Sequence, residues 1–103
     1  MGNYRSKLDI IADILAVASR KPKKTHIMYQ ANLSFQVLQR YLAEMSEAAL
    51  ICFEAETQCY NLTSKGKEFL EAYLQYSKSN RHAEKIIEEV NSKKQILEKL
   101  FNR

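Results

Sequence analysis

Apolar residues recur at three- and four-residue steps through residues 4–20, as they do along the buried side of a helix. The apolar positions of this segment are Leu8, Ile10, Ile11, Ile14, Leu15, Val17 and Ala18. The sequence Lys21-Pro22-Lys23 follows, and the residue before a proline disfavours helical geometry. We therefore predict a first helix over residues 4–20 that is buried along much of its surface.

Two further helical stripes lie back to back in residues 25–45, with a short turn between them. Thr25 suits the N-cap of a short helix that runs to about Ala31, and Asn32 tolerates the left-handed backbone of a turn. Ser34 suits the N-cap of a third helix. The inner stripe of that helix is Val37, Leu38, Tyr41, Leu42 and Met45. This arrangement predicts a helix-turn-helix, although antiparallel helices of a bundle would show the same stripes.

Residues 50–62 change to the two-residue period of β-strands. One face of the predicted hairpin carries Ile51, Phe53, Tyr60 and Leu62. The other face carries Cys52, Glu54, Cys59 and Asn61. We place the tip of the hairpin at Glu56 and Thr57. A helix bundle would not contain a hairpin at this point. A helix-turn-helix followed by a hairpin is the winged-helix plan, in which the hairpin is the wing.

A long helical pattern fills the rest of the chain. Thr63 suits its N-cap, and Gly66 in its first turn weakens the helix by about 1 kcal/mol relative to Ala. A heptad seam then runs through Phe69, Tyr73, Tyr76, Asn80, Ala83, Ile87, Val90, Lys94, Leu97 and Phe101. Residues 77–81 include weak helix formers, so the sequence allows one continuous helix or two helices with a break there.

The heptad seam predicts self-association. Beyond about Asn80 the chain has no sequence left to cover the seam, and so many exposed apolar residues would favour aggregation of a monomer. We expect a two-fold homodimer paired through Tyr76, Asn80, Ala83, Ile87, Val90, Lys94, Leu97 and Phe101. Folding back onto its own domain is the alternative, which we expect for Phe69, Leu70 and Tyr73. The domains are then residues 1–68, which bind DNA, and residues 69–103, which dimerise.

Composition and charge narrow the function. The chain of 103 residues is 46% hydrophobic and 27% charged, as expected of one small folded domain with an appendage. Its net charge of +4 favours an anionic partner, foremost nucleic acid and less often a membrane surface. No apolar run approaches the roughly 20 residues of a membrane span, and the start lacks a signal-peptide core. We expect a cytoplasmic, nucleoid-associated protein without membrane contact.

Patterns typical of enzymes are not evident. The sequence has no phosphate-binding glycine loop, no metal-binding histidine pair and no nucleophile signature. We predict no catalytic residue, no cofactor, no metal site and no small-molecule ligand. Cys52 and Cys59 would face each other if Ala55 and Glu56 formed the turn of the hairpin, and they would be offset with the tip at Glu56 and Thr57. Their redox state stays open.

An acid-free stretch marks the predicted interface. Residues 14–43 contain no Asp or Glu, and the outer face of the third helix shows Phe35, Gln36, Gln39, Arg40 and Ala43. Gln can pair with adenine and Arg with guanine, and the absence of acids suits a polyanion. We predict DNA contacts from Lys21, Lys23, Lys24, Thr25, Ser34, Phe35, Gln36, Gln39, Arg40 and Lys65. A merely solvated face is the alternative and, for Phe35, packing against the second helix.

A family resemblance rests on three runs, YQANLSFQVLQRYL, ALI and YNLTSKGKEFLEAY. Together they resemble archaeal winged-helix proteins that dimerise through a long C-terminal helix, among them the small basic ten-kilodalton chromatin-type proteins of crenarchaea. The resemblance covers nearly the whole chain. It implies a DNA-binding homodimer whose antiparallel coiled coil holds two winged-helix domains apart.

Two features depart from that family pattern. Ala48-Ala49 replaces the glycine common after the third helix. The wing carries Glu54 and Glu56 without Lys or Arg, which argues against insertion of the wing into a groove. We expect sequence-tolerant or modestly specific binding of double-stranded DNA, by a transcription regulator or an architectural chromatin protein. A protein–protein interaction module is the alternative, which the acidic wing favours slightly.

Overall fold

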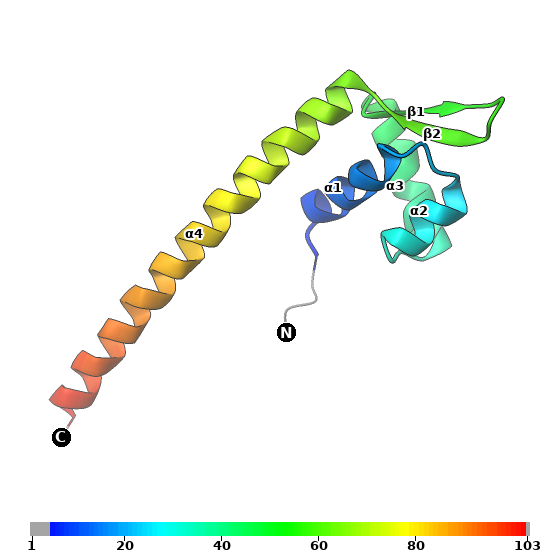
Figure 1. The fold of residues 1–103 in the computed structure, drawn as a ribbon. Helices are drawn as coiled ribbons and strands as arrows, with labels where there is room; N and C mark the ends of the chain where they lie inside the picture. The colour runs from blue at the N-terminus through cyan, green and yellow to red at the C-terminus, as the bar shows by residue number, and fades with distance from the viewer. Residues whose placement is uncertain (1–4, 103) are drawn as a thin grey trace. The chain divides into compact units, whose positions relative to one another are not determined.

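The fold was analysed in a computed structural model that describes residues 5–102. Along the chain, three helices precede a two-stranded antiparallel hairpin and a last long helix (Figure 1). These elements are α1 (Lys7–Ala18), α2 (Lys24–Gln30), α3 (Phe35–Glu47), β1 (Ile51–Glu54), β2 (Cys59–Leu62) and α4 (Ser64–Phe101). The predicted winged-helix plan with a long C-terminal helix is confirmed.

The chain divides into two compact units, Met1–Tyr73 and Leu74–Arg103. The first, called here the winged-helix unit, holds α1 to α3, the hairpin and the start of α4. The second is the remainder of α4, called here the outer α4 segment. Our expected bounds, 1–68 and 69–103, concern where DNA binding ends and dimerisation begins, and they stay a prediction.

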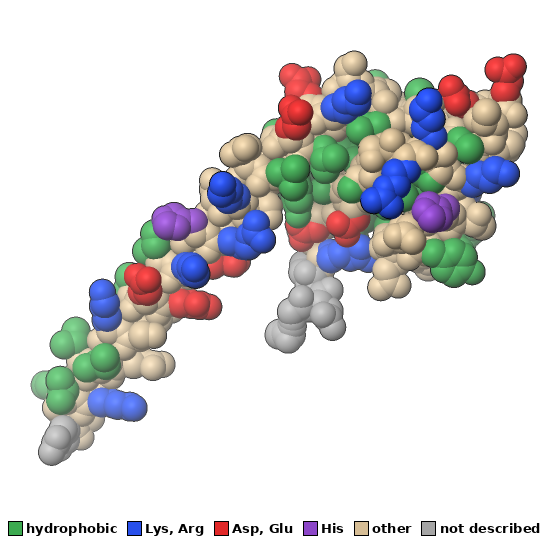
Figure 2. Space-filling model, viewed as in Figure 1, with side chains coloured by type: hydrophobic (Ala, Val, Ile, Leu, Met, Phe, Trp, Pro, Cys, Tyr) green, Lys and Arg blue, Asp and Glu red, His purple; other side chains and the backbone are tan. Residues whose placement is uncertain are grey.

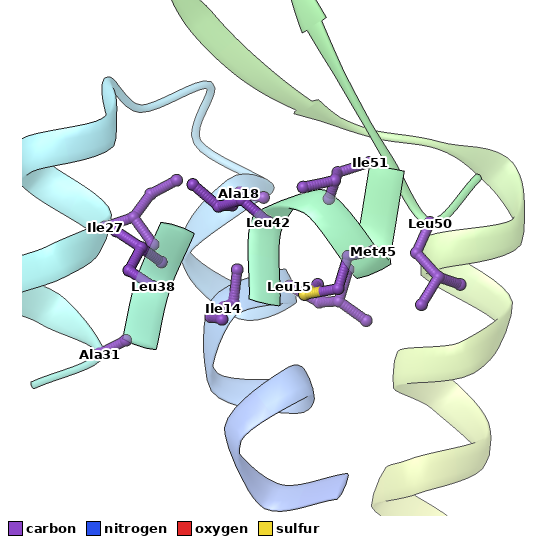
Figure 3. Packing of buried hydrophobic residues seen from close by; sticks show 10 residues of the cluster. All are labelled: Ile14, Leu15, Ala18, Ile27, Ala31, Leu38, Leu42, Met45, Leu50 and Ile51. Atoms are coloured by element: carbon purple, nitrogen blue, oxygen red, sulfur yellow. The ribbon is translucent and has the colours of Figure 1, made fainter. Parts of the chain in front are cut away.

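One hydrophobic core holds the winged-helix unit together (Figure 3). Side chains from α1, α2, α3 and the start of β1 meet in it. They are Ile14, Leu15, Ala18, Ile27, Ala31, Leu38, Leu42, Met45, Leu50 and Ile51. From the predicted inner stripe of α3, Val37 and Tyr41 are only half-buried, and Tyr41 packs against the edge of the core. Burial of a Leu or Ile side chain contributes about 1.5–3 kcal/mol to stability. The buried side chains of α3 therefore hold this helix in one orientation, with its opposite face at the surface.

The first helix is shorter than predicted. Its N-cap is Ser6, whose hydroxyl accepts from the Asp9 N–H at 3.2 Å while the Asp9 carboxylate accepts from the Ser6 N–H at 3.0 Å. This reciprocal capping box starts α1 at Lys7. The predicted start at Tyr4 lies outside the described residues. The helix ends at Ala18, before Arg20, and Lys21 ahead of the proline has a left-handed φ of 54°.

Our prediction that Thr25 caps α2 is wrong. The N-cap is Lys23, which makes no side-chain capping bond, and Thr25 lies inside the helix. The reason is a contact distant in sequence. Lys23 forms an isolated β-bridge with Cys59, and the Tyr60 N–H donates to the Pro22 carbonyl at 2.9 Å. The hairpin therefore fixes the chain before α2 and sets where that helix begins.

The turn between α2 and α3 agrees with the sequence. Asn32 is left-handed, with a φ of 54°. Ser34 caps α3, because its hydroxyl accepts from the Val37 N–H at 3.3 Å. At the other end of α3, Ala49 takes the left-handed conformation that a glycine would adopt more easily, with a φ of 64°. For an L-residue this conformation costs about 1–2 kcal/mol.

The hairpin register confirms the predicted faces. Ile51 pairs with Leu62 and Phe53 with Tyr60, whose rings lie 5.0 Å apart between centroids. Burial raises the pKa of the Tyr60 phenol. Gln58 belongs to the turn of the hairpin, with a φ of 61°.

The same register settles the relation of the two cysteines. Glu54 pairs with Cys59, which places the tip at Glu56 and Thr57, and Cys52 pairs with Asn61. The cysteines are therefore offset along the hairpin, and both are free thiols.

The last helix is continuous over 38 residues, so no break occurs at residues 77–81. At 1.5 Å per residue it is about 57 Å long. Weak helix formers cost only tenths of a kcal/mol each, too little to interrupt a helix that lacks an internal proline. Thr63 acts as predicted, because its hydroxyl accepts from the Gly66 N–H at 2.9 Å.

Gly66 has a role that the sequence reading missed. It is buried, and a Cβ at this position would lie 2.2 Å from the backbone oxygen of Leu50. Real Cβ atoms do not approach so closely. Gly66 therefore permits the first turn of α4 to pack directly on the chain that leads into β1, and this close approach outweighs its weak helix propensity.

Candidate nucleic-acid interface

The candidate interface is built from the loop before α2, from α2 itself and from the first half of α3. Lys and Arg side chains gather around α2 and the loop before it on the face shown in Figure 2, while acidic side chains mark the tip of the hairpin. The exposed members of the predicted site are Lys21, Lys23, Thr25, Ser34, Phe35, Gln36, Gln39, Arg40 and Lys65. Lys24 is half-buried.

The third helix presents two different faces. Leu38, Leu42 and Met45 are buried in the core. Gln36, Gln39 and Arg40 are exposed on the solvent side. The core thereby fixes the direction in which the exposed amide and guanidinium groups point. Such groups are the common readers of base edges in a DNA groove.

Lys24 joins α2 to α3. Its ammonium lies 4.2 Å from the centroid of the Phe35 ring, and it donates a hydrogen bond to Oε1 of Gln39. Phe35 thus remains 57% exposed while it contacts α2 through this lysine. Packing against the second helix therefore holds in part, through the contact with the Lys24 cation, and the DNA contact of Phe35 stays a prediction.

The charged side chains of the interface are all positive. The first turns of α2 and α3 contain no acidic residue. The first acid on α3 is Glu44, whose carboxylate lies 3.1 Å from the ammonium of Lys7. A neighbouring cation offsets part of that negative charge, although both side chains are exposed and the pair contributes little stability.

Lys65 lies apart from the other predicted site residues. Its ammonium donates to the Ala48 carbonyl at 2.7 Å, at the C-terminal end of α3. A 13-residue helix separates Ala48 from Ser34, which corresponds to about 20 Å. The cation satisfies a free carbonyl at the negative end of the helix dipole. The fold therefore gives Lys65 a structural contact and separates it from Lys24 and Phe35.

The sequence matches the winged helix-turn-helix family over residues 4–81. The chain belongs to this family. The crystal structure of Sso10a-2, described as a DNA-binding protein from Sulfolobus solfataricus, has a similar fold, with a TM-score of 0.78 and 23% sequence identity. The similarity covers 85% of this chain and 95% of that one. Among curated proteins, none matches the sequence significantly.

Arg5 is a residue of this winged helix-turn-helix that sequence reasoning missed. Its guanidinium donates to the carbonyls of Ala31 at 2.7 Å and Asn32 at 3.0 Å, and to the Asp13 carboxylate at 2.8 Å. It therefore satisfies carbonyls at the C-terminal end of α2 and ties the turn of the helix-turn-helix to α1. The Ala31 contact spans 26 residues, and no local periodicity signals such a distant pair.

The wing of this family member is acidic and partly apolar. Glu54 and Glu56 are exposed, and the Thr57 hydroxyl donates to the Glu54 carboxylate at 3.2 Å. Phe53 is half-exposed beside Tyr60. A wing of this composition is poorly suited to follow a phosphate backbone.

Every predicted dimerisation residue is exposed in the single chain. Exposed large apolar side chains recur along the outer α4 segment at Leu74, Tyr76, Ile86, Ile87, Val90, Ile96, Leu97, Leu100 and Phe101. No helix among residues 5–102 is apolar enough over a sufficient length to cross a membrane. Within the same residues, no group of three or more His, Cys, Asp or Glu could hold a metal ion.

Proposed function

We propose that the protein binds double-stranded DNA through α2 and α3, with the first half of α3 facing the major groove. The observation that carries this proposal is the exposed, acid-free face of α3 with Gln36, Gln39 and Arg40. The core of the winged-helix unit holds this face in place, and a major groove is wide enough to admit an α-helix. The description of Sso10a-2 as a DNA-binding protein supports the proposal.

Phosphate contact would supply most of the affinity. Lys21, Lys23 and Thr25 are exposed at the start of α2, and Ser34 is exposed at the start of α3. Lysines beside a helix-turn-helix neutralise phosphates and release counterions, which drives binding without regard to sequence. Few side chains can reach base edges, so we propose sequence-tolerant or modestly specific binding in the nucleoid. Such binding suits either a transcription regulator or an architectural chromatin protein.

The active form would be a homodimer joined through the outer α4 segment, with its two helices antiparallel as the family resemblance implies. The exposed seam around Ile87, Val90 and Leu97 is the support for this part of the proposal. Pairing two copies would bury that seam, and Asn80 and Lys94 within it would help to fix the register. A dimer would also present two recognition helices to one duplex.

A second candidate function is favoured by the wing. An exposed Phe53 beside Glu54 and Glu56 would suit a basic protein partner better than it would suit DNA. In that case the winged helix would serve as a protein–protein interaction module.

A salt titration of binding to random-sequence duplex DNA separates these functions. We expect the affinity of the parent to fall steeply with salt, and Lys23→Ala to reduce the slope by about one unit. Arg40→Ala should cost about 1–3 kcal/mol of binding. Lys93→Ala, which removes one positive charge from the outer α4 segment, is the matched control and should bind nearly as the parent does.

Two results would contradict the proposal. An effect of Lys93→Ala as large as that of Lys23→Ala would indicate diffuse attraction without a defined interface. Absence of binding even at low salt would remove the DNA-binding function and direct attention to the wing as a protein-binding surface.

A further inference from the structure

Lys24 is held between two side chains of the proposed recognition helix. Phe35 and Gln39 are one helical turn apart on α3 and so lie on the same face. The Lys24 ammonium faces the Phe35 ring at 4.2 Å and donates to Gln39 Oε1. Lys24 is half-buried, while the Lys21 and Lys23 side chains are exposed. Among these lysines, Lys24 is therefore the one placed to act on a base-reading side chain.

The contact decides which end of the Gln39 amide is free. A glutamine amide offers one oxygen acceptor and one NH₂ donor group, whereas a lysine ammonium can only donate. The atom facing Lys24 must therefore be the oxygen. The NH₂ group is left to face a ligand, with the positive charge of Lys24 beside it.

This arrangement opposes the usual pairing of glutamine with adenine. That pairing requires the amide oxygen to accept from adenine N6–H while the amide NH₂ donates to N7. Beside Lys24, the oxygen already accepts a hydrogen bond, and the ammonium repels the positive hydrogens of adenine N6. Guanine instead presents two acceptors, O6 and N7, at the same edge. A donor pair made of an ammonium and an amide NH₂ complements guanine.

We infer that Lys24 is a specificity-determining residue, which turns Gln39 into a donor and makes the recognition helix favour guanine over adenine. This inference rests on the proposed DNA-binding function. Phe35 supports it by holding the Lys24 cation against its ring, which gives an exposed aromatic side chain a role. Lys24 acts through Gln39 as well as through its own charge.

The test is binding selection from a duplex library with a randomised core, at one fixed salt concentration. We expect the parent to prefer guanine over adenine by about tenfold at one position of each half-site. Lys24→Met keeps the aliphatic stem and removes the donor, so the preference should disappear or turn toward adenine. Lys24→Arg retains a cationic donor and should restore the guanine preference. Thermal unfolding of each variant verifies that it folds.

Lys23→Met is the matched control, since it removes the same charge from the adjacent position. It should weaken binding to every sequence alike and leave the guanine-to-adenine ratio unchanged. If Lys24→Met behaves as Lys23→Met does, Lys24 contacts phosphate only and the inference is wrong. A parent that binds DNA without any base preference overturns the inference and leaves the proposed function standing. A parent that binds no duplex overturns both.

Discussion

The winged-helix unit and the outer α4 segment use the same kinds of apolar residue with opposite results. Ile14, Leu15 and Ile27 are fully buried in the first unit. In the second, Ile87, Val90 and Leu97 are 57%, 58% and 68% exposed. Apolar periodicity therefore indicates that a helix face must be shielded from water. It does not indicate whether the residues that shield it belong to the same chain.

The difference has a thermodynamic consequence. The core of the winged-helix unit is closed within one chain, so its stability should not depend on protein concentration. Any stability that the outer α4 segment gains from pairing must depend on concentration by mass action. An isolated helix gains little stability in water from propensity alone. Predictions can therefore be directed at one region while the other serves as reference.

The largest effect is expected at the seam of the outer α4 segment. Ile87→Asp would place one carboxylate from each copy in the proposed dimer interface. An unpaired buried charge costs several kcal/mol, so the dimer should be weakened by about 3–5 kcal/mol. Sedimentation equilibrium should then record a monomer at concentrations where the parent is a dimer. Unfolding of the winged-helix unit should be unchanged.

Ser92→Asp provides the control for this prediction. It adds the same charge outside the seam, about 200° around the helix from Val90. This variant should remain dimeric. An Ile87→Asp protein that keeps the mass of the parent would show that this seam is not the interface.

Local signals predicted most of the fold. Ser34 as a cap, Asn32 as a left-handed residue and the hairpin tip at Glu56 are short-range features, and each is confirmed. Capping and turn chemistry act within three or four residues, so they can be read directly from the sequence. The misplaced start of α2 has a different origin, since the hairpin that fixes Lys23 lies far along the chain.

Gly66→Ala should have the next largest effect, on the free energy of unfolding. The sign of this effect distinguishes helix propensity, which is local, from tertiary packing against Leu50. Helix propensity alone would stabilise the variant by about 1 kcal/mol. The added Cβ would instead lie 2.2 Å from the backbone oxygen of Leu50. A backbone atom cannot move aside as easily as the end of a flexible side chain can. We expect a net loss of about 2–3 kcal/mol in the free energy of unfolding, measured by urea denaturation.

Glu68→Ala is the reference for this substitution. It changes an exposed residue near the same end of α4 and should alter the unfolding free energy by less than about 0.5 kcal/mol. Increased stability of Gly66→Ala would mean that the first turn of α4 moves away from Leu50 at little cost. The close approach would then not constrain the winged-helix unit.

The candidate interface was only partly accessible to sequence reasoning. An outward stripe with Gln39 and Arg40 follows from the period of α3, and the lack of acids is visible in the composition. The contacts of Arg5 with Ala31 and of Lys24 with Gln39 span 26 and 15 residues, and they depend on how α1, α2 and α3 pack. Lys65 has the positive charge expected of a phosphate ligand, but its ammonium donates to the Ala48 carbonyl at the C-terminal end of α3.

The smallest effect on stability is expected from substitution of Asp9. This residue of α1 accepts a hydrogen bond from Tyr73 in the first part of α4. The Tyr73 hydroxyl and the Ser6 N–H donate to its carboxylate and hold the pKa of Asp9 below its ordinary value. A carboxyl group with a lowered pKa in the folded protein stabilises it above about pH 4, and this contribution is lost as the pH falls through the folded-state pKa. Asp9→Asn should therefore be less stable than the parent at pH 7, with a difference that shrinks below pH 4.

Tyr73→Phe removes the largest cause of the lowered pKa while the capping box of α1 stays intact. Its acid dependence should fall between those of the parent and Asp9→Asn, and adding Asp9→Asn to Tyr73→Phe should cost less than Asp9→Asn alone. Thermal unfolding from pH 7 to pH 2.5 measures all four proteins. A parent-to-Asp9→Asn difference that stays constant over this range would mean that the carboxylate caps α1 without any linkage to its charge. The stability that Asp9 gives the winged-helix unit would then come from hydrogen-bond geometry, which an asparagine side chain reproduces only in part.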